Sequence, residues 1–325
     1  MVTNTYNDIY EYINKNGQAS IVELFDHFKI SRQAIFKHIN RLQKEGLIYK
    51  IGRSPKVFYL PKTPSIDKNI STISQNKKEI IDENYLIITP DGQRLEGVIG
   101  FEYWCNKQNL PVEKTADEYI NTLEKYNKYK KEGLINATTK IKDSFREVGL
   151  DTMYYKDFYS IERFGKTKLG QILLYAKQSQ DRSLIKEISD IIKPSIVDMI
   201  KENNIDAIGF IPPTVKREVQ LMRELERSLS ISLPIINLVK IKGDVTIPQK
   251  TLNKIEDRME NARKSIIIDD KKVYNNILLI DDAVGSGATL NETAIQVKNK
   301  HLCKGKIIGL AITGSFKGFD VISEV

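Results

Sequence analysis

The first 62 residues carry a periodic pattern of apolar positions that predicts three helices and a β-hairpin. Ser20 and Ser31 stand directly before two of the apolar-periodic segments, where a hydroxyl can cap the free N–H groups of a helix start. Residues 51–56 contain Gly and Pro, which favour a turn between two β-like runs. The expected elements are helices over 4–16, 21–28 and 32–46 and strands over 47–50 and 57–60. We therefore predict a first domain over residues 1–62.

The following stretch is polar and then mixed, and it carries no motif that indicates a function. Residues 63–84 are rich in Lys, Ser, Asn and Ile, which predicts a linker. Residues 85–150 are expected to connect this linker to the C-terminal domain or to belong to that domain. We expect strands over 86–89 and 98–103 and one or two charged helices within 115–145.

From residue 151 to the end, the pattern becomes an alternation of apolar runs and amphipathic segments. The expected strands cover 172–177, 205–211, 235–239, 277–280 and 307–312, and the expected helices cover 183–203, 215–229, 252–265 and 289–300. This order predicts an α/β domain over 151–325 with a mostly parallel sheet flanked by helices. Ligands of such sheets bind beyond the carboxyl ends of the strands, so the search for a site is confined to those loops.

Charge and composition narrow the classes of function. The chain of 325 residues has a formal net charge of +8, and residues 1–62 contain ten basic and five acidic side chains, which favours a polyanionic partner. The sequence has no apolar stretch of the ~20 residues that a membrane span needs, and its two cysteines lie far apart. We expect a cytoplasmic protein without a membrane partner. The three histidines show no metal-ligand spacing, so no protein-held metal is expected.

The order helix, helix, turn, helix, hairpin over residues 4–60 resembles the winged helix-turn-helix family. The resemblance implies that the helix after Ser31 enters the major groove of a nucleic acid. The residues expected to meet bases and phosphates are Ser31, Arg32, Gln33, Lys37, His38 and Arg41, with Arg53 and Lys56 on the wing. The alternative is a protein-binding or dimerisation module, as many winged helices are.

A second group of candidate functional residues follows the apolar run 277–280. Two acids, Asp281 and Asp282, are followed by a glycine-containing loop that leads into a predicted helix at Thr289. The loop N–H groups and the positive end of the helix favour a phosphate, with hydroxyls from Ser286 and Thr289 as further donors. Carboxylates repel a phosphate but accept hydrogen bonds from the vicinal hydroxyls of a sugar. Phosphate plus ribose is the implied ligand. A strand end of the Walker B type is the alternative, but the upstream loop that it requires is missing.

Residues 277–289 resemble the signature of type I phosphoribosyltransferases. The resemblance implies that Asp281 and Asp282 form the catalytic acid pair, which holds the ribose 2′- and 3′-hydroxyls of phosphoribosyl diphosphate. It assigns the 5′-phosphate to Val284, Gly285, Ser286, Gly287, Ala288 and Thr289. The usual pair of threonines in mid-loop is replaced here by Gly285-Ser286, which weakens the inference of turnover more than the inference of binding.

Three further segments resemble the ComF-like branch of that family. Residues 208–214 resemble its strand and diphosphate loop, and 249–261 resemble its later signature with one extra residue before Arg258. Residues 170–177 resemble its opening helix. The implied contacts to the diphosphate are Pro213, Thr214, Lys216, Arg217, Lys177 and Arg258. Mg²⁺ is expected to arrive with the diphosphate, and no protein nucleophile is expected.

The two resemblances together support two hypotheses about function. A winged helix fused to a ComF-like phosphoribosyltransferase is similar to the effectors of certain retron anti-phage systems, in which a reverse transcriptase and its RNA-DNA product hold a toxin inactive. The alternative is a transcriptional regulator that senses phosphoribosyl diphosphate with a non-catalytic phosphoribosyltransferase fold, similar in outline to bacterial purine repressors. Fold analogy implies a homodimer in either case.

Overall fold

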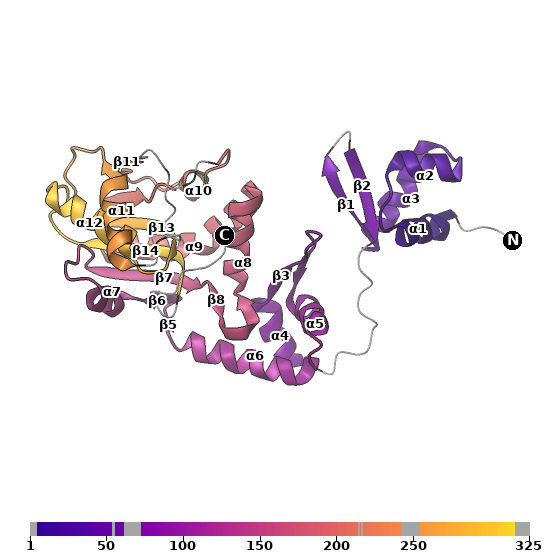
Figure 1. Ribbon diagram of the computed structural model, residues 1–325, viewed down its shortest axis with the longest axis horizontal. Helices are drawn as coiled ribbons and strands as arrows, with labels where there is room; N and C mark the ends of the chain where they lie inside the picture. Colours follow the sequence, from indigo (N-terminus) through magenta and orange to yellow (C-terminus); the bar gives the residue numbers. More distant parts are fainter. Residues whose placement is uncertain are drawn as a thin grey trace. The chain divides into compact units, whose positions relative to one another are not determined.

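The computed structural model describes residues 5–53, 56–61, 73–213, 215, 217–241, 252 and 254–315. The chain divides into two compact units, unit 1 over Met1–Thr72 and unit 2 over Ile73–Val325 (Figure 1). None of the helices in these described ranges is long and apolar enough to span a membrane.

Unit 1 has the predicted winged-helix order. Its elements are α1 (Thr5–Asn16), α2 (Ile21–Phe28), α3 (Arg32–Lys44), β1 (Ile48–Arg53) and β2 (Lys56–Pro61). Ser20 and Glu23 form a reciprocal capping box at the start of α2, and the Ala34 N–H donates to Ser31 Oγ at 3.2 Å at the start of α3. The strands pair antiparallel and continue closer to the turn than the sequence predicted. The helices bury an apolar stripe that makes one small core with β1 and β2.

Unit 2 begins with a packed helix in part of the stretch that we expected to be a linker. The helix α4 (Gln75–Asn84) buries Ile81, so the linker prediction for 63–84 is wrong over this part. Its neighbours are β3 (Leu86–Ile88), β4 (Arg94–Glu96), α5 (Gly97–Lys107) and α6 (Val112–Asn127). The expected strand over 98–103 is also wrong, because α5 occupies these residues. Helical spacing places Phe101 and Cys105 on the buried side of α5, where Phe101 packs edge-on against Tyr85.

The main sheet has six strands in the order β10-β13-β14-β7-β6-β5. The four strands β10 (Ala207–Phe210), β13 (Ile277–Val284), β14 (Ile307–Gly314) and β7 (Thr152–Phe158) are parallel. The strands β6 (Leu134–Asn136) and β5 (Lys130–Lys131) add an antiparallel edge. The sequence analysis missed β7. The mostly parallel α/β fold class is confirmed.

Helices cover both faces of this sheet, which explains why its central strands are apolar throughout. Residues Leu278 and Ile280 of β13 pack in a cluster with α8 (Lys168–Ser179), α9 (Arg182–Glu202) and α10 (Leu221–Leu229). Residues Ile277 and Leu279 pack in the other cluster, which includes α12 (Ala288–Asn299). The remaining elements are α7 (Thr138–Ser144), β8 (Ser160–Ile161), the short 3₁₀ helix Glu162–Phe164, β9 (Gly165–Lys166), β11 (Leu238–Lys240), α11 (Ile255–Ser265) and β12 (Ile266–Ile268).

Three further expectations for unit 2 need correction. The expected strand over 172–177 is part of α8, because Thr167 caps a helix that buries residues at helical spacing. The expected helix over 215–229 begins only at Leu221. The expected strand over 235–239 contributes to the main sheet only an isolated bridge between Ile208 and Ile235, and β11 pairs instead with β12.

Candidate functional site

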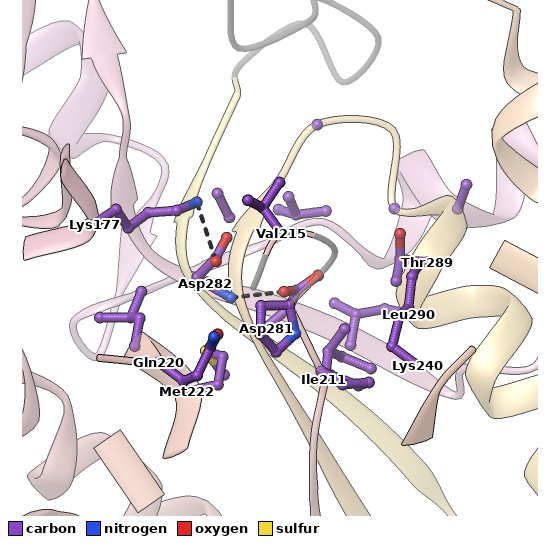
Figure 2. A pocket seen from close by; sticks show the side chains of 18 of the residues that line it. Lys177, Ile211, Val215, Gln220, Met222, Lys240, Asp281, Asp282, Thr289 and Leu290 are labelled. Carbon is purple, nitrogen blue, oxygen red and sulfur yellow. Dashed lines mark hydrogen bonds and ion pairs between the residues drawn. The ribbon is translucent and has the colours of Figure 1, made fainter. Parts of the chain in front are cut away.

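A cavity of about 290 Å³ opens where β10 and β13 end, at the edge of the sheet that the fold class predicts for a ligand. Its lining includes most of the residues that the sequence singled out in this unit (Figure 2). These are Lys177, Pro213, Arg217, Arg258, Asp281, Asp282, Val284, Gly285, Ser286, Gly287, Ala288 and Thr289. Thr214 and Lys216, which were predicted beside them, lie outside the described residues. The fold thus brings segments about 110 residues apart, Lys177 and Thr289, to one cavity.

The two acids lie on β13 itself, because the strand continues past the expected end at Ile280 as far as Val284. Asp281 Oδ1 accepts a hydrogen bond from the Asp282 N–H at 2.8 Å. The ammonium of Lys177, from α8, lies 3.1 Å from Asp282 Oδ2, and Figure 2 shows both interactions. One acid therefore has a cationic partner at contact distance, and the other faces the cavity beside it.

The protonation of Asp281 is strongly perturbed. Its burial raises the pKa of the carboxyl to about 7, and the negative charge of Asp282 acts in the same direction. The charges of Lys177 and Lys240 oppose this rise. A carboxyl with a pKa near neutrality can bind a sugar hydroxyl as an acceptor or hold a proton, and a small change in nearby charge decides which.

Lys240 is a lining residue that the sequence analysis missed. It ends β11, where burial lowers the pKa of its ammonium group while the charge of Asp281 opposes that shift. No local pattern marks it, since it is one lysine in the apolar run Leu238–Ile241. Only the tertiary structure brings it to the acids of β13.

The loop between β13 and α12 has the features of an anion cradle. Gly287 has φ of 82°, and a Cβ added there would overlap the side chain of Ile141, so the position requires glycine. The Ala288 N–H lies 3.3 Å from Ser286 Oγ at the first residue of α12. The N-terminus of α12 thus opens on the cavity with its positive end, next to the hydroxyl of Ser286.

Side chains buried around α12 and α11 fix the position of this cradle. Asn291 donates to the Glu147 carbonyl and accepts from the Gly149 N–H, each at 2.9 Å. The Glu292 carboxylate, 1% exposed, pairs with Arg263 of α11 at 3.0 Å. Arg258 of α11 is buried at the cavity and donates from Nε to the Leu252 carbonyl at 2.7 Å, and burial lowers the pKa of its guanidinium.

Part of the cavity wall is apolar. Ile211, at the end of β10, and Met222 and Leu290, from α10 and α12, line it together with the polar groups. Gln220, labelled in Figure 2 beside Met222, stands directly before α10. The arrangement has a charged region near the two acids and a region suited to an uncharged group. No cluster of three or more potential metal-ligating side chains occurs among the residues that the structure describes.

The predicted nucleic-acid surface in unit 1 lies on α3 and is strongly basic. Arg32, Gln33, Lys37 and Arg41 are exposed, His38 is half-buried near Tyr6, and α3 contains no acidic residue. The Ser31 hydroxyl is the N-cap acceptor. The side chains of Arg53 and Lys56 lie outside the described part of the hairpin.

Two of these arginines have partners within unit 1. The guanidinium of Arg41 lies 4.5 Å from the centre of the Tyr6 ring and donates from Nε to Glu45 Oε1 at 2.8 Å. The Tyr6 hydroxyl also donates to Glu45. Arg32 lies 5.5 Å from the Phe25 ring. The exposed residues Phe36 and Asn40 on the same helix were missed by the sequence analysis.

Comparisons with known proteins identify the N-terminal domain. Residues 7–49 match the family described as winged helix-turn-helix DNA-binding, which confirms the winged helix-turn-helix prediction over these residues. Among solved structures, the chain is similar to a crystal structure of a hypoxanthine phosphoribosyltransferase from Staphylococcus aureus, with 12% identity and a TM-score of 0.22. The alignment covers 39% of this chain and 74% of that chain. No curated protein matches the sequence.

Proposed function

We propose that the cavity in unit 2 binds the ribose 5-phosphate part of phosphoribosyl diphosphate. The observation that carries the proposal is the placement of Asp281 and Asp282 on β13 in the same cavity as the N-terminus of α12. The helix start and the loop N–H groups suit the 5′-phosphate. The two carboxylates suit the ribose 2′- and 3′-hydroxyls, which an anion cradle alone would not hold.

The cations of the cavity suit the diphosphate. Lys177 neutralises Asp282 at 3.1 Å, and Arg217, Lys240 and Arg258 line the same space. Mg²⁺ bound to the diphosphate would offset its charge as it leaves. Asp281 and Asp282, adjacent on β13 at this cavity, offer carboxylate oxygens that would lie near such an ion. Asp281 and Asp282 then hold the ribose as positive charge develops on it.

Titration calorimetry with phosphoribosyl diphosphate and Mg²⁺ tests this site. We expect binding by the wild-type chain and its loss in the Asp281→Asn/Asp282→Asn variant. The matched control is Asp190→Asn, which removes one exposed carboxylate on α9 that pairs with Lys186. Equal binding by the wild type and the double variant would refute the assignment of the acids, and absence of binding by the wild type would refute the ligand.

We further propose that the whole chain is a nucleic-acid-binding effector of a bacterial retron anti-phage system. The DNA-binding family match of residues 7–49 and the basic face of α3 support the nucleic-acid partner, DNA or an RNA-DNA hybrid. The ribose-phosphate site supports an enzymatic toxin, a phosphoribosyltransferase that a reverse transcriptase and its product hold inactive. Two copies of the chain are expected to associate.

Growth of a bacterial host tests the effector hypothesis. Expression of the chain alone is expected to slow growth, and Asp281→Asn/Asp282→Asn is expected to relieve the effect while Asp190→Asn retains it. The hypothesis also predicts a reverse-transcriptase gene beside the gene of this chain, and coexpression of that reverse transcriptase with its RNA template is then expected to relieve the effect. Toxicity that persists in the double variant at equal protein level contradicts an enzymatic effector.

A transcriptional regulator that senses phosphoribosyl diphosphate is the second candidate. The observation that favours it is the loop itself, in which Gly285-Ser286 replace the hydroxyl-rich pair expected of an active enzyme. A regulator binds the ligand without releasing diphosphate from it. If the wild type releases more diphosphate than the Asp281→Asn/Asp282→Asn variant does, the chain is an enzyme. If it releases none and its affinity for DNA changes when phosphoribosyl diphosphate binds, the chain is a regulator.

A further inference from the structure

The outward face of α3 presents exposed side chains that unit 1 does not use for packing. Ile35, Ile39 and Leu42 form the buried stripe of the helix. On the other sides, exposed positions follow at intervals of three and four residues, so that they share one surface over two turns. They are Gln33, Phe36, Lys37 and Asn40.

Three other polar residues of this region have partners inside unit 1. Ser31 caps the helix, and Arg41 is held between the Tyr6 ring and Glu45. Arg32 lies against the ring of Phe25. We therefore expect the four exposed residues Gln33, Phe36, Lys37 and Asn40 to contact the base edges.

Phe36 is the unusual member of this set. Its side chain is 44% exposed, although Ile35 beside it is fully buried and the surrounding surface is basic and polar. The exposed part of this ring is available to a partner outside unit 1. In a major groove it finds an apolar partner, because the 5-methyl group of thymine is the apolar feature that base pairs present there.

The amides on either side of Phe36 match the same base pair. The side-chain amide of Asn or Gln can make two hydrogen bonds to one adenine: its NH₂ group donates to N7, and its oxygen accepts from the N6 amino group. Asn40 lies seven positions after Gln33, which corresponds to a rise of about 10 Å along the helix, or about three base-pair steps. The helix can thus contact adenines at two positions and a thymine between them.

We propose that α3 reads A·T base pairs in the major groove of B-form DNA, with adenine contacted by Gln33 and Asn40 and the thymine methyl by Phe36. This inference rests on the nucleic-acid binding proposed for unit 1 and specifies its ligand. It favours duplex DNA over an RNA-DNA hybrid, because the major groove of an A-form helix is too deep and narrow for side chains to read. Lys37 neutralises a neighbouring phosphate.

The test compares two duplexes that differ by the thymine methyl group alone, together with an RNA-DNA hybrid. Fluorescence anisotropy of the full chain is measured with alternating dA–dT duplex, with alternating dA–dU duplex, and with an rA·dT hybrid. The wild type is expected to bind the dA–dT duplex about fourfold more tightly than the dA–dU duplex, the effect of one methyl group removed from water. The hybrid is expected to bind more weakly than either duplex.

Substitution assigns this preference to a residue. Phe36→Ala is expected to bind both duplexes equally, whereas Phe36→Leu, which keeps an apolar side chain, retains part of the difference. The control Val22→Ala removes another exposed apolar side chain of unit 1, 54% exposed on α2, and is expected to keep the full difference. Circular dichroism confirms that each variant is folded.

The outcomes separate this inference from the proposal on which it rests. Binding of the dA–dT and dA–dU duplexes with equal affinity by the wild type, or tighter binding of the hybrid, overturns the A·T reading and leaves nucleic-acid binding intact. Absence of binding to all three probes overturns both. A methyl preference that persists in Phe36→Ala shows that Phe36 is not the reader and overturns its assignment to the thymine methyl group.

Discussion

At the scale of single residues, the two acids of β13 differ in their surroundings although they are adjacent. Asp282 has the Lys177 ammonium at 3.1 Å, whereas the pKa of Asp281 is raised to about 7 by burial and by the charge of its neighbour. Ionisation of Asp281 in the folded protein therefore lowers the free energy of unfolding. The folded protein keeps the proton on Asp281 more tightly than the unfolded chain does.

This difference predicts that Asp281→Asn stabilises the protein more at pH 8 than at pH 5. The folded-state pKa of about 7 lies above the unfolded value of 3.8, so this group lowers the free energy of unfolding as pH rises between the two values. Above pH 7 the full cost is present, on the order of 2–4 kcal/mol, and an amide does not incur it.

Urea denaturation at the two pH values measures this effect. Asp190→Asn, an exposed substitution with the same change of charge, is expected to change the free energy of unfolding by less than about 0.5 kcal/mol at either pH. A variant Asp281→Asn that is less stable than the wild type at pH 8 contradicts the raised pKa.

Glu45 pairs with Arg41, so its carboxylate competes with a phosphate for this guanidinium, and it adds a negative charge beside the basic helix. Its carboxylate accepts from Arg41 Nε at 2.8 Å. We predict that Glu45→Ala tightens binding of duplex DNA by about two- to fivefold at low salt, because a phosphate then replaces the carboxylate as the partner of Arg41. Anisotropy titrations measure the affinity. Glu11→Ala on α1 is the charge-matched control, and an equal gain in it would show a general effect of net charge.

At the scale of elements, the contact between α11 and α12 supports the phosphate cradle. Glu292 is 1% exposed and has Arg263 at 3.0 and 3.2 Å, while Arg263 itself is 58% exposed. A buried carboxylate that loses its partner keeps the cost of its desolvation. The pair therefore matters more than the exposed position of the arginine suggests.

We predict that Arg263→Ala lowers the free energy of unfolding by about 1–3 kcal/mol. Adding Glu292→Gln to this variant is expected to recover part of the loss, since the amide carries no charge. The adjacent Lys264→Ala breaks an exposed pair with Glu260 and should cost less than about 0.5 kcal/mol. If Arg263→Ala and Lys264→Ala lower the free energy of unfolding equally in denaturation curves, the pair of Arg263 with the buried Glu292 stabilises the protein no more than an exposed pair does.

At the scale of the whole molecule, the two candidate surfaces belong to different compact units. The basic face lies on α3 in unit 1, and all the described lining residues of the cavity lie in unit 2. Variants that remove charge from α3 are thus expected to change nucleic-acid binding and to leave the binding of phosphoribosyl diphosphate by the cavity unchanged.

The triple variant Arg32→Ala/Lys37→Ala/Arg41→Ala is predicted to weaken DNA binding and to reduce the dependence of log affinity on log salt. Each lost phosphate contact lowers the slope by about 0.9, so a reduction of up to about 3 is expected. The control removes three exposed lysines of unit 2, Lys186, Lys271 and Lys304. An unchanged slope in the α3 variant would favour a protein-binding role for the winged helix.

The sequence by itself determined the features that depend on neighbouring residues. Caps at Ser20 and Ser31, helical periodicity and turn residues defined the winged helix, and the apolar strand before Asp281 located the glycine loop. These patterns are local, because a cap or a turn acts over three or four residues. They also predicted the α/β class and most of the residues that line the cavity.

Only the tertiary structure decided where an apolar run could be either a strand or a helix. The run 98–103 became part of α5, since the burial of its side chains against distant segments outweighs local propensity. For the run 172–177, periodicity predicted a strand and the family resemblance implied a helix, and the structure has the helix α8. The same holds for the site: the role of Lys240 and the pKa of Asp281 arise from burial and from charges far apart in sequence. Local sequence patterns do not predict these contacts, because the residues that make them lie far apart in the sequence.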